Sequence, residues 1–309
     1  MKDRLVTLVG GGGFVGRYVA QALLTAGARV RVAQRAPQRA FFLKPLGGLG
    51  QTQFVAADVT RPASLARAVA GSDAVVNLVG SFARMQAINA DGAGAVAQAA
   101  ADAGAAAFVH VSAIGADDES PSAYGRSKAA GEAATRAAFP DAIVVRPSIV
   151  FGREDAFTNR FAGLAAMLPV MPVLRGAARF QPVYVKDIAR AVAAVLADPE
   201  AHAGKTYELG GPDVMTMRDV NEVLARMVGR DVGIVDVPDA VGAGIAMLGF
   251  LPGAPITADQ WKMLQRDTVV TGEDGFAVLG IVPVPLAAVA PDWLVRFRRH
   301  GRFGKRQPA

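Results

Sequence analysis

Short runs rich in valine alternate with longer segments rich in alanine, and this alternation restricts the fold of the chain more than any other feature. The runs lie at residues 4–9, 28–34, 52–58, 73–79, 106–112 and 142–148. Strands that are apolar along their whole length are typical of a parallel sheet covered by helices on both faces. The sequence therefore predicts an α/β fold with a doubly wound parallel sheet, whose ligands bind at the carboxyl ends of the strands.

The alternation of valine-rich and alanine-rich segments ends after Phe151, where prolines occur at 169, 172 and 182 and long valine runs are no longer found. We therefore expect a smaller C-terminal lobe, in which Thr216 and Asp219 have the spacing of a helix-capping box. The predicted domains are residues 1–150 with 181–200 returning to them, a lobe of 151–180 and 201–295, and a basic tail of 296–309.

The chain of 309 residues has no cysteine and only three histidines, and it is 52% hydrophobic. This composition belongs to a folded protein with a large core. Thiolate catalysis and cysteine-ligated metals are excluded, and the scattered histidines do not predict a metal site. The chemistry must come from hydroxyls, lysines, carboxylates or a cofactor.

The net charge of +6 comes from the tail, where six basic residues follow residue 295 without an acidic one. The rest of the chain is neutral and contains no recognised nucleic-acid-binding module, so we expect no nucleic-acid partner. Residues 240–258 carry no charge, but their glycines and prolines favour a packed or interfacial element over a membrane span. The tail and this segment together suggest peripheral contact with an anionic membrane surface, and a tail that only aids solubility is the alternative.

The N-terminus passes from Met1 directly into the first apolar run, without the apolar region and cleavage site of a secretory signal. We therefore expect a cytoplasmic protein, located in part on the inner face of the cytoplasmic membrane.

A glycine-rich turn follows the first predicted strand and opens the first predicted helix. Gly10, Gly13 and Gly16 have the spacing G-x-x-G-x-x-G. Glycine lets the backbone approach a pyrophosphate, and the N–H groups and dipole of the following helix favour its negative charge. The position of this turn predicts a Rossmann-like site for a dinucleotide.

Arginines replace the expected acid at the end of the second predicted strand. A site for NAD(H) commonly offers a carboxylate to the ribose hydroxyls, but this chain has Arg35 and Arg39 there. Guanidinium groups suit a ribose phosphate, so the sequence favours NADP(H), with NAD(H) as the less favoured cofactor. Two solvated surface arginines are the alternative interpretation.

A tyrosine and a lysine lie one helical turn apart after the fifth predicted strand. Tyr124 and Lys128 therefore share a helix face, where the ammonium group can lower the pKa of the phenol and bind a nicotinamide ribose. The pair is either a proton-transfer device or a means of holding the cofactor.

Together these motifs resemble the extended or atypical short-chain dehydrogenases/reductases. Narrower stretches, such as HVSAIGAD and RPSIVFGREDAFTNRFA, resemble the bacterial relatives of the NAD(P)H-binding accessory subunit of respiratory complex I. This resemblance implies tight binding of NADPH without firm evidence of turnover, and it implies a respiratory complex as a partner. The residues expected to contact the cofactor are Gly10, Gly13, Phe14, Val15, Gly16, Arg35, Arg39, Asp58, Val59, Leu78, Val79, Gly80, Val111, Tyr124, Lys128, Pro147, Ser148 and Val150.

One position departs from the active members of this family. They place a second serine or threonine after strand five to polarise the substrate oxygen, but here Ala113 follows Ser112. The leading hypothesis is therefore an NADP(H)-binding protein with low or no turnover. The alternative is an active NADP-dependent reductase or nucleotide-sugar epimerase/dehydratase, in which Tyr124 is the acid/base, Lys128 supports it, and Ser112 or a water polarises the substrate.

Overall fold

The computed structural model describes residues 1–251, 254–299 and 301, which form two compact units. Unit 1 comprises Met1–Pro147, Val185–Leu209 and Thr271–Val282. Unit 2 comprises Ser148–Tyr184, Gly210–Val270 and the described part of 283–309. Each unit has its own core and is described by itself.

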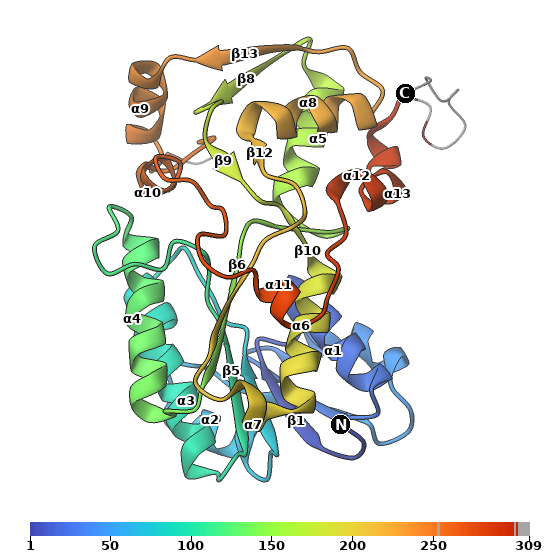
Figure 1. Ribbon diagram of the computed structural model, residues 1–309, viewed down its shortest axis with the longest axis vertical. Helices are drawn as coiled ribbons and strands as arrows, with labels where there is room; N and C mark the ends of the chain where they lie inside the picture. The colour runs from blue at the N-terminus through green and yellow to red at the C-terminus, as the bar shows by residue number, and fades with distance from the viewer. Residues whose placement is uncertain (252–253, 300, 302–309) are drawn as a thin grey trace. The chain divides into compact units, whose positions relative to one another are not determined.

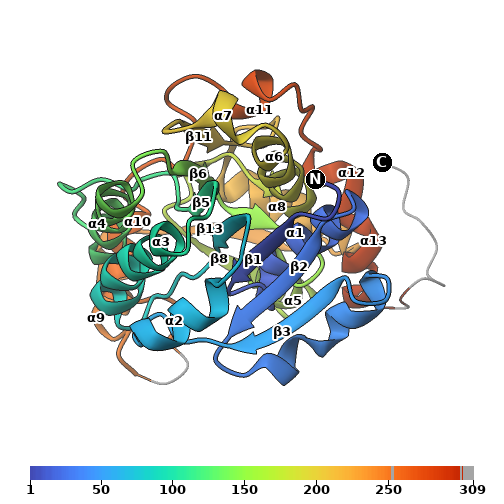
Figure 2. The same ribbon diagram turned by 90° about the horizontal axis from the view of Figure 1, so that it is seen from below.

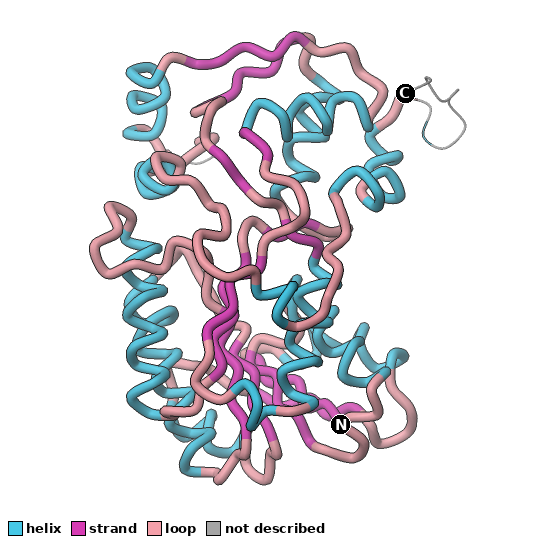
Figure 3. The backbone as a smooth tube through the Cα atoms, in the orientation of Figure 1, coloured by secondary structure: helices cyan, strands magenta, loops and turns pink. Residues whose placement is uncertain are grey.

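A parallel sheet of seven strands forms the centre of unit 1, in the order β11-β6-β5-β4-β1-β2-β3 (Figure 3). The predicted doubly wound α/β fold is confirmed, and each of the six valine-rich runs forms a strand. The strands are β1 (Leu5–Val9), β2 (Arg29–Gln34), β3 (Thr52–Ala56), β4 (Ala74–Asn77), β5 (Ala107–Val111), β6 (Ile143–Pro147) and β11 (Thr206–Leu209).

Helices cover both faces of this sheet because its central strands are apolar on both sides (Figure 2). On one face α1 packs against α6, and on the other α3 lies between α2 and α4. The helical elements of unit 1 are α1 (Phe14–Thr25), α2 (Pro62–Val69), α3 (Gly92–Asp102), α4 (Ala123–Ala138), α6 (Val185–Ala197), α7 (Pro199–His202), α11 (Gly275–Val278), the 3-10 segment η1 (Pro37–Leu46) and the π-helical segment η2 (Gln86–Asp91).

Two segments that the sequence placed in the smaller lobe belong to unit 1. Residues 206–209 form the edge strand β11, which pairs with β6, and residues 271–282 pack beside β11. The N–H of Thr271 donates a hydrogen bond of 2.9 Å to the Glu208 carboxylate. The sequence did not reveal this placement, because residue types do not show which strands pair over a long distance in the sequence.

Unit 2 contains three short strand pairs and two main helices, α5 and α8 (Figure 1). These helices contribute to a core that includes Phe151, Leu224 and Trp293. The predicted capping box of α8 is present, with the Asp219 N–H donating to Thr216 Oγ1 over 3.1 Å. The elements are β7 (Val150–Phe151), β8 (Val170–Leu174), β9 (Arg179–Phe180), β10 (Val183–Tyr184), β12 (Met215–Thr216), β13 (Gly233–Val237), α5 (Phe157–Met167), α8 (Met217–Met227), α9 (Asp239–Met247), α10 (Ala258–Met263), α12 (Leu286–Val289), α13 (Pro291–Leu294) and the 3-10 segment η3 (Val295–Phe297).

The uncharged segment 240–258 begins as α9, which packs on α10. A Cβ atom on Gly242 would lie 2.6 Å from the Trp261 ring, so only glycine fits at this crossing. The far side of the segment is exposed, with Met247 at 74% and Phe250 at 79% of full exposure. No helix among the described residues has the length and apolar character needed to cross a bilayer.

The predicted basic tail is described only in part. Arg296 donates to Asn159 Oδ1 over 2.7 Å, and Arg298 donates to the Met227 carbonyl over 2.8 Å, so the first residues of the tail are fixed to unit 2. Arg302, Lys305 and Arg306 lie outside the described residues.

Candidate functional site

The glycine-rich turn joins β1 to α1 in a geometry that admits little besides glycine at two positions. Gly10 has a φ of +82°, and its N–H donates to the Ala33 carbonyl over 2.8 Å. A Cβ atom on Gly16 would lie 2.6 Å from the Gly11 carbonyl oxygen, so this glycine lets the helix pack directly on the turn. No side chain caps the start of α1, and the N–H groups of its first turn are therefore free to bind an anion.

A cavity of about 420 Å³ opens beside this turn, at the carboxyl ends of β2, β3 and β4. Its position is the one expected for a ligand of a doubly wound sheet. Nine predicted cofactor residues line it, namely Gly10, Gly13, Arg35, Arg39, Asp58, Val59, Leu78, Val79 and Gly80.

The remaining predicted residues do not line this cavity. Phe14, Val15 and Gly16 form the first turn of α1. Val111, Tyr124, Lys128 and Pro147 lie on β5, α4 and β6 of unit 1, whereas Ser148 and Val150 belong to unit 2.

Three arginines line the cavity, and the sequence revealed only two of them. Arg84 joins Arg35 and Arg39, from a loop where its φ is +51°, in the left-handed region that favours glycine. None of the three forms a salt bridge within the described chain. The guanidinium groups are therefore available to a polyanionic ligand.

Asp58 supplies the one carboxylate among the residues that line the cavity. Its Oδ1 accepts hydrogen bonds from the Thr60 N–H at 3.0 Å and the Thr60 hydroxyl at 2.8 Å. These bonds lower the pKa of Asp58, with smaller contributions from the charges of Arg61 and Arg35. Asp58 is thus an anion held by its own turn, and the cavity keeps an excess of positive charge.

Gln34 is a positioning residue that the sequence analysis missed. Its Oε1 accepts a hydrogen bond of 3.1 Å from the Gly12 N–H, and its Nε2 donates to the Ala36 carbonyl at 2.7 Å. The Gln34 side chain therefore stabilises the glycine turn, and both ends of its amide are already hydrogen-bonded within the protein. The sequence feature that could have pointed to Gln34 is its position as the last residue of β2, where an NAD(H) site commonly has an acid.

Lys128 is buried on α4 with only 2% of its surface exposed. Its Nζ donates a hydrogen bond of 2.9 Å to the Val111 carbonyl. Burial lowers the pKa of Lys128 to about 8, although the charge of Glu132 acts in the opposite direction. Glu132 itself is held by Arg146 through two hydrogen bonds, of 2.9 and 2.7 Å.

The ring of Tyr124 stacks on Phe82, with centroids 4.4 Å apart and planes 23° from parallel. Burial raises the pKa of Tyr124 to about 12. A general base needs the phenolate, so this shift is opposite to the one that base catalysis requires. The phenol is protonated at neutral pH and can donate a proton.

The residues that follow β5, among them Ser112 and Ala113, run beside the end of β6. The Ser112 N–H donates to the Val145 carbonyl and the Ile114 N–H to the Pro147 carbonyl. Ser112 is buried, and its hydroxyl has no hydrogen-bond partner within the described chain. His110 of β5 lies two residues before Ser112, and burial keeps its pKa well below the usual value.

Comparisons with known proteins agree with this geometry. The model of the NAD dependent epimerase/dehydratase family matches residues 6–210. The mouse protein NADH dehydrogenase (ubiquinone) 1 alpha subcomplex subunit 9, mitochondrial, is 34% identical over 306 residues, which cover 96% of this chain and 81% of that protein. A ceramide reductase of Caulobacter vibrioides is 32% identical over 87% of this chain and 81% of its own length.

The fold is similar to that of solved reductases. The triphenylmethane reductase of Citrobacter sp., complexed with NADP(H), superimposes with a TM-score of 0.76 over 93% of this chain and 99% of the reductase, at 21% identity.

Proposed function

The chain belongs to the NAD-dependent epimerase/dehydratase family, and from this premise we propose that it binds NADP(H) in the unit 1 cavity with little or no turnover. The positive charge of the cavity is the observation that favours NADP(H) over NAD(H). Arg35, Arg39 and Arg84 line it, and its one carboxylate is engaged by Thr60. A ribose phosphate offers three oxygens to such a group of guanidiniums, whereas the ribose hydroxyls of NAD(H) offer them no charge.

Two features support low turnover. Ala113 stands where active members of the family carry a hydroxyl that polarises the substrate oxygen, and burial raises the pKa of Tyr124 to about 12. Loss of a single donor of this kind typically removes ~3–4 kcal/mol of transition-state stabilisation. We therefore assign to the pair on α4 the role of holding the cofactor, with Lys128 as the proposed contact to the nicotinamide ribose.

The partner that best fits this role is a respiratory complex. The mouse relative is by name a subunit of NADH dehydrogenase, and the match extends over 96% of this chain. A protein that retains its nucleotide and shows no substrate turnover serves such an assembly as a structural subunit. With such a partner, we propose that the protein is located peripherally at the inner face of the cytoplasmic membrane.

A second candidate is a reductase that acts on a lipid ketone. The similarity to a ceramide reductase favours it, and Tyr124, which is protonated at neutral pH, is the side chain that would donate the proton that reduction requires. The bound NADPH would supply hydride to the carbonyl carbon and Tyr124 a proton to its oxygen, giving an alcohol and NADP⁺, with solvent reprotonating the tyrosine. The ceramide reductase relative makes an oxidised ceramide the first substrate to test.

One experiment tests the cofactor and the turnover together. The purified protein is denatured, the released nucleotide and its redox state are identified, and NADPH oxidation is followed with quinones, nucleotide sugars and an oxidised ceramide. We expect NADP(H), with Kd values for NADPH well below those for NADH, and negligible oxidation that Ala113→Ser increases. A native rate near ~10 per second that Tyr124→Phe abolishes would establish the reductase instead. Equal affinity for NADPH and NADH would overturn the choice of cofactor.

A further inference from the structure

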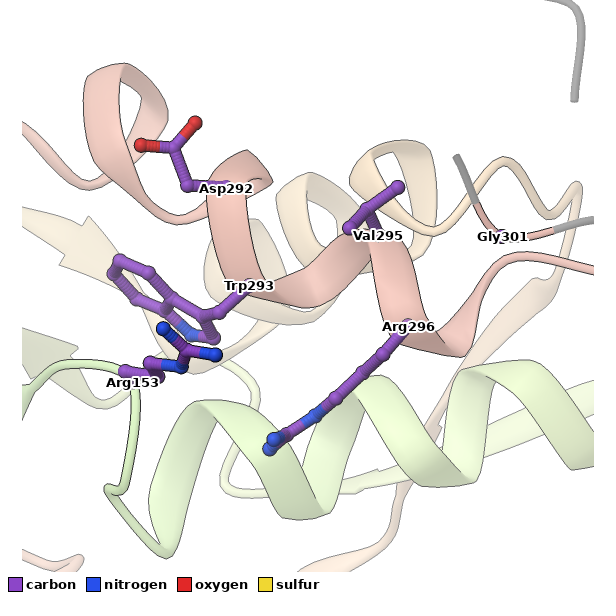
Figure 4. A pocket seen from close by; sticks show the side chains of 6 residues that line it. All are labelled: Arg153, Asp292, Trp293, Val295, Arg296 and Gly301. Carbon is purple, nitrogen blue, oxygen red and sulfur yellow. The ribbon is translucent and has the colours of Figure 1, made fainter. Parts of the chain in front are cut away.

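Unit 2 contains a pocket of about 240 Å³ that is lined by hydrogen-bond donors (Figure 4). Its lining residues are Arg153, Asp292, Trp293, Val295, Arg296 and Gly301. Arg153 lies in the turn after β7, and the others lie on α13, η3 and the residues that follow. Since these segments are far apart in the sequence, the motifs gave no indication of the pocket.

The indole N–H of Trp293 is the unusual group in this pocket. Trp293 has 7% of its surface exposed, and its ring stacks on Tyr184 with the planes 9° from parallel. Its Nε1 is buried and has no acceptor within the described chain. A buried donor without an acceptor typically costs ~1–3 kcal/mol, so such a group requires an explanation.

The two arginines cannot satisfy this N–H, because guanidinium groups only donate hydrogen bonds. Arg296 contacts the amide oxygen of Asn159 and the Phe297 ring, and Arg153 forms no salt bridge within the described chain. Figure 4 shows the Arg153 guanidinium next to the indole, at the same end of the pocket. Donors from two side chains therefore meet without an acceptor.

Asp292 is the carboxylate of the pocket, and it does not supply the missing acceptor. It is exposed, and Figure 4 shows its oxygens turned away from both guanidinium groups. It forms no salt bridge within the described chain. An acceptor must therefore come from outside the pocket's own side chains.

We propose that this pocket of unit 2 binds a phosphoryl group through Arg153, Arg296 and the Trp293 N–H. A phosphate oxygen can accept from the indole and from a guanidinium at once, and the planar guanidinium matches two oxygens of the same phosphate. Arg153 is long and exposed, so its side chain can move to admit an oxygen to the shielded N–H. The group is either a free phosphate compound or the headgroup of an anionic lipid, and both present the same oxygens.

Tryptophan fluorescence gives a direct test, because the chain contains only Trp261 and Trp293. In the full-length Trp261→Phe variant, all tryptophan emission comes from Trp293. Inorganic phosphate is titrated against sodium chloride of equal ionic strength, and the wild-type chain is titrated in parallel by calorimetry in case the substitution disturbs the fold. We expect a saturable change in emission with phosphate in the millimolar range and none with chloride.

Substitutions then test whether Arg153 and Arg296 donate hydrogen bonds to the phosphate. Arg153→Gln and Arg296→Gln should each weaken phosphate binding about tenfold, the usual effect of losing a charged hydrogen bond. Arg226→Gln, on the exposed face of α8, is the matched control and should leave binding unchanged. A response that persists in the Arg153→Gln/Arg296→Gln double variant, or that chloride reproduces, overturns the proposal.

Vesicles distinguish the two sources of the phosphoryl group. Phosphatidylglycerol vesicles that shift the Trp293 emission, and lose this effect in Arg153→Gln, identify a lipid headgroup. A response to phosphate without one to vesicles identifies a soluble ligand. No response to either contradicts the site, and this result would leave the nucleotide cavity of unit 1 unaffected.

Discussion

At the scale of single residues, burial shifts the pKa values of Tyr124 and Lys128 in opposite directions. The pKa of the phenol rises to about 12 and that of the ammonium group falls to about 8. In both cases burial disfavours the charged form. The pair therefore has a protonated phenol and a lysine close to its titration range.

Lys128→Met tests this burial through the pH dependence of stability. Folding lowers the lysine pKa from 10.5 to about 8, so between these values the unfolded chain binds the proton more tightly than the folded chain. The cost of burying Lys128 is present in full below pH 8 and decreases as the pH rises toward 10.5.

Relative to Lys128→Met, wild type should gain up to ~3 kcal/mol in its free energy of unfolding between pH 7 and 10. Urea unfolding of both proteins across this range measures the difference. A difference that stays constant with pH would show that Lys128 titrates normally.

Arg35→Ala tests the charge of the nucleotide cavity. A charge-assisted hydrogen bond to phosphate contributes ~1.5–3 kcal/mol, so the variant should bind NADPH about ten- to a hundredfold more weakly and NADH almost as before. Arg67→Ala, on the exposed side of α2, is the control, because Arg67 does not line the cavity. Calorimetric titration with both nucleotides gives the four affinities, and a similar loss for NADH would show that Arg35 does not discriminate.

At the scale of elements, a buried ion pair joins α4 to β6. Glu132 on α4 is almost fully buried and is held by Arg146 of β6, whose side chain is 28% exposed. This pair fixes the helix that carries Tyr124 and Lys128 against the sheet. The charge of Glu132 also raises the pKa of Lys128 and thereby opposes the effect of burial.

Glu132→Gln should destabilise unit 1 by about 2–4 kcal/mol, because it removes the nearest counter-charge of the partly buried Arg146 and leaves only the Glu208 carboxylate at 3.8 Å. Glu222→Gln is the control: its carboxylate on α8 is 38% exposed and pairs with Arg218 and Arg226 at 3.8 and 3.9 Å. Pairs of this kind contribute less than ~1 kcal/mol. Urea unfolding compares the two variants, and equal losses would show that the α4 pair is no stronger than a surface pair.

The elements also show where prediction from sequence succeeded and failed. Valine-rich runs identified β1, β2, β4, β5 and β6 because a central strand of a parallel sheet is covered on both faces and must be largely apolar. The partly polar run at β3 lies at the edge of the sheet, where none of its residues is buried. The strand at 206–209 could be read from the sequence, but its place beside β6 could not, because nearly sixty residues separate β11 from β6 and residue types do not show which strands pair over such a distance. The role of Gln34 depends on which way a side chain turns, and Arg84 lies in a loop without a motif, so neither could be read from residue types.

At the scale of the whole molecule, apolar surface and positive charge are both found on unit 2. Five large apolar side chains of α9 and the turn after it are about half exposed or more, namely Val241, Met247, Leu248, Phe250 and Leu251. The basic residues from Arg296 onward carry the net positive charge of the chain. Exposed apolar side chains can enter the interfacial layer of a membrane and basic side chains attract anionic headgroups, so each of the two features by itself supports the proposed peripheral placement.

Replacing Met247 and Phe250 together with serine tests this placement. Full burial of such a side chain contributes ~1.5–3 kcal/mol, so even half-burial of both should make the wild-type chain bind phosphatidylglycerol vesicles at least about tenfold more tightly than the double variant. Leu49→Ser is the control, because Leu49 is fully exposed on unit 1. Co-sedimentation is measured at low and high salt: added salt should weaken the contribution of the basic residues and leave the apolar contribution in place. Binding that the double variant retains in full at both salt concentrations would exclude α9 and its turn as the membrane contact, and binding lost entirely at high salt would assign the contact to charge alone.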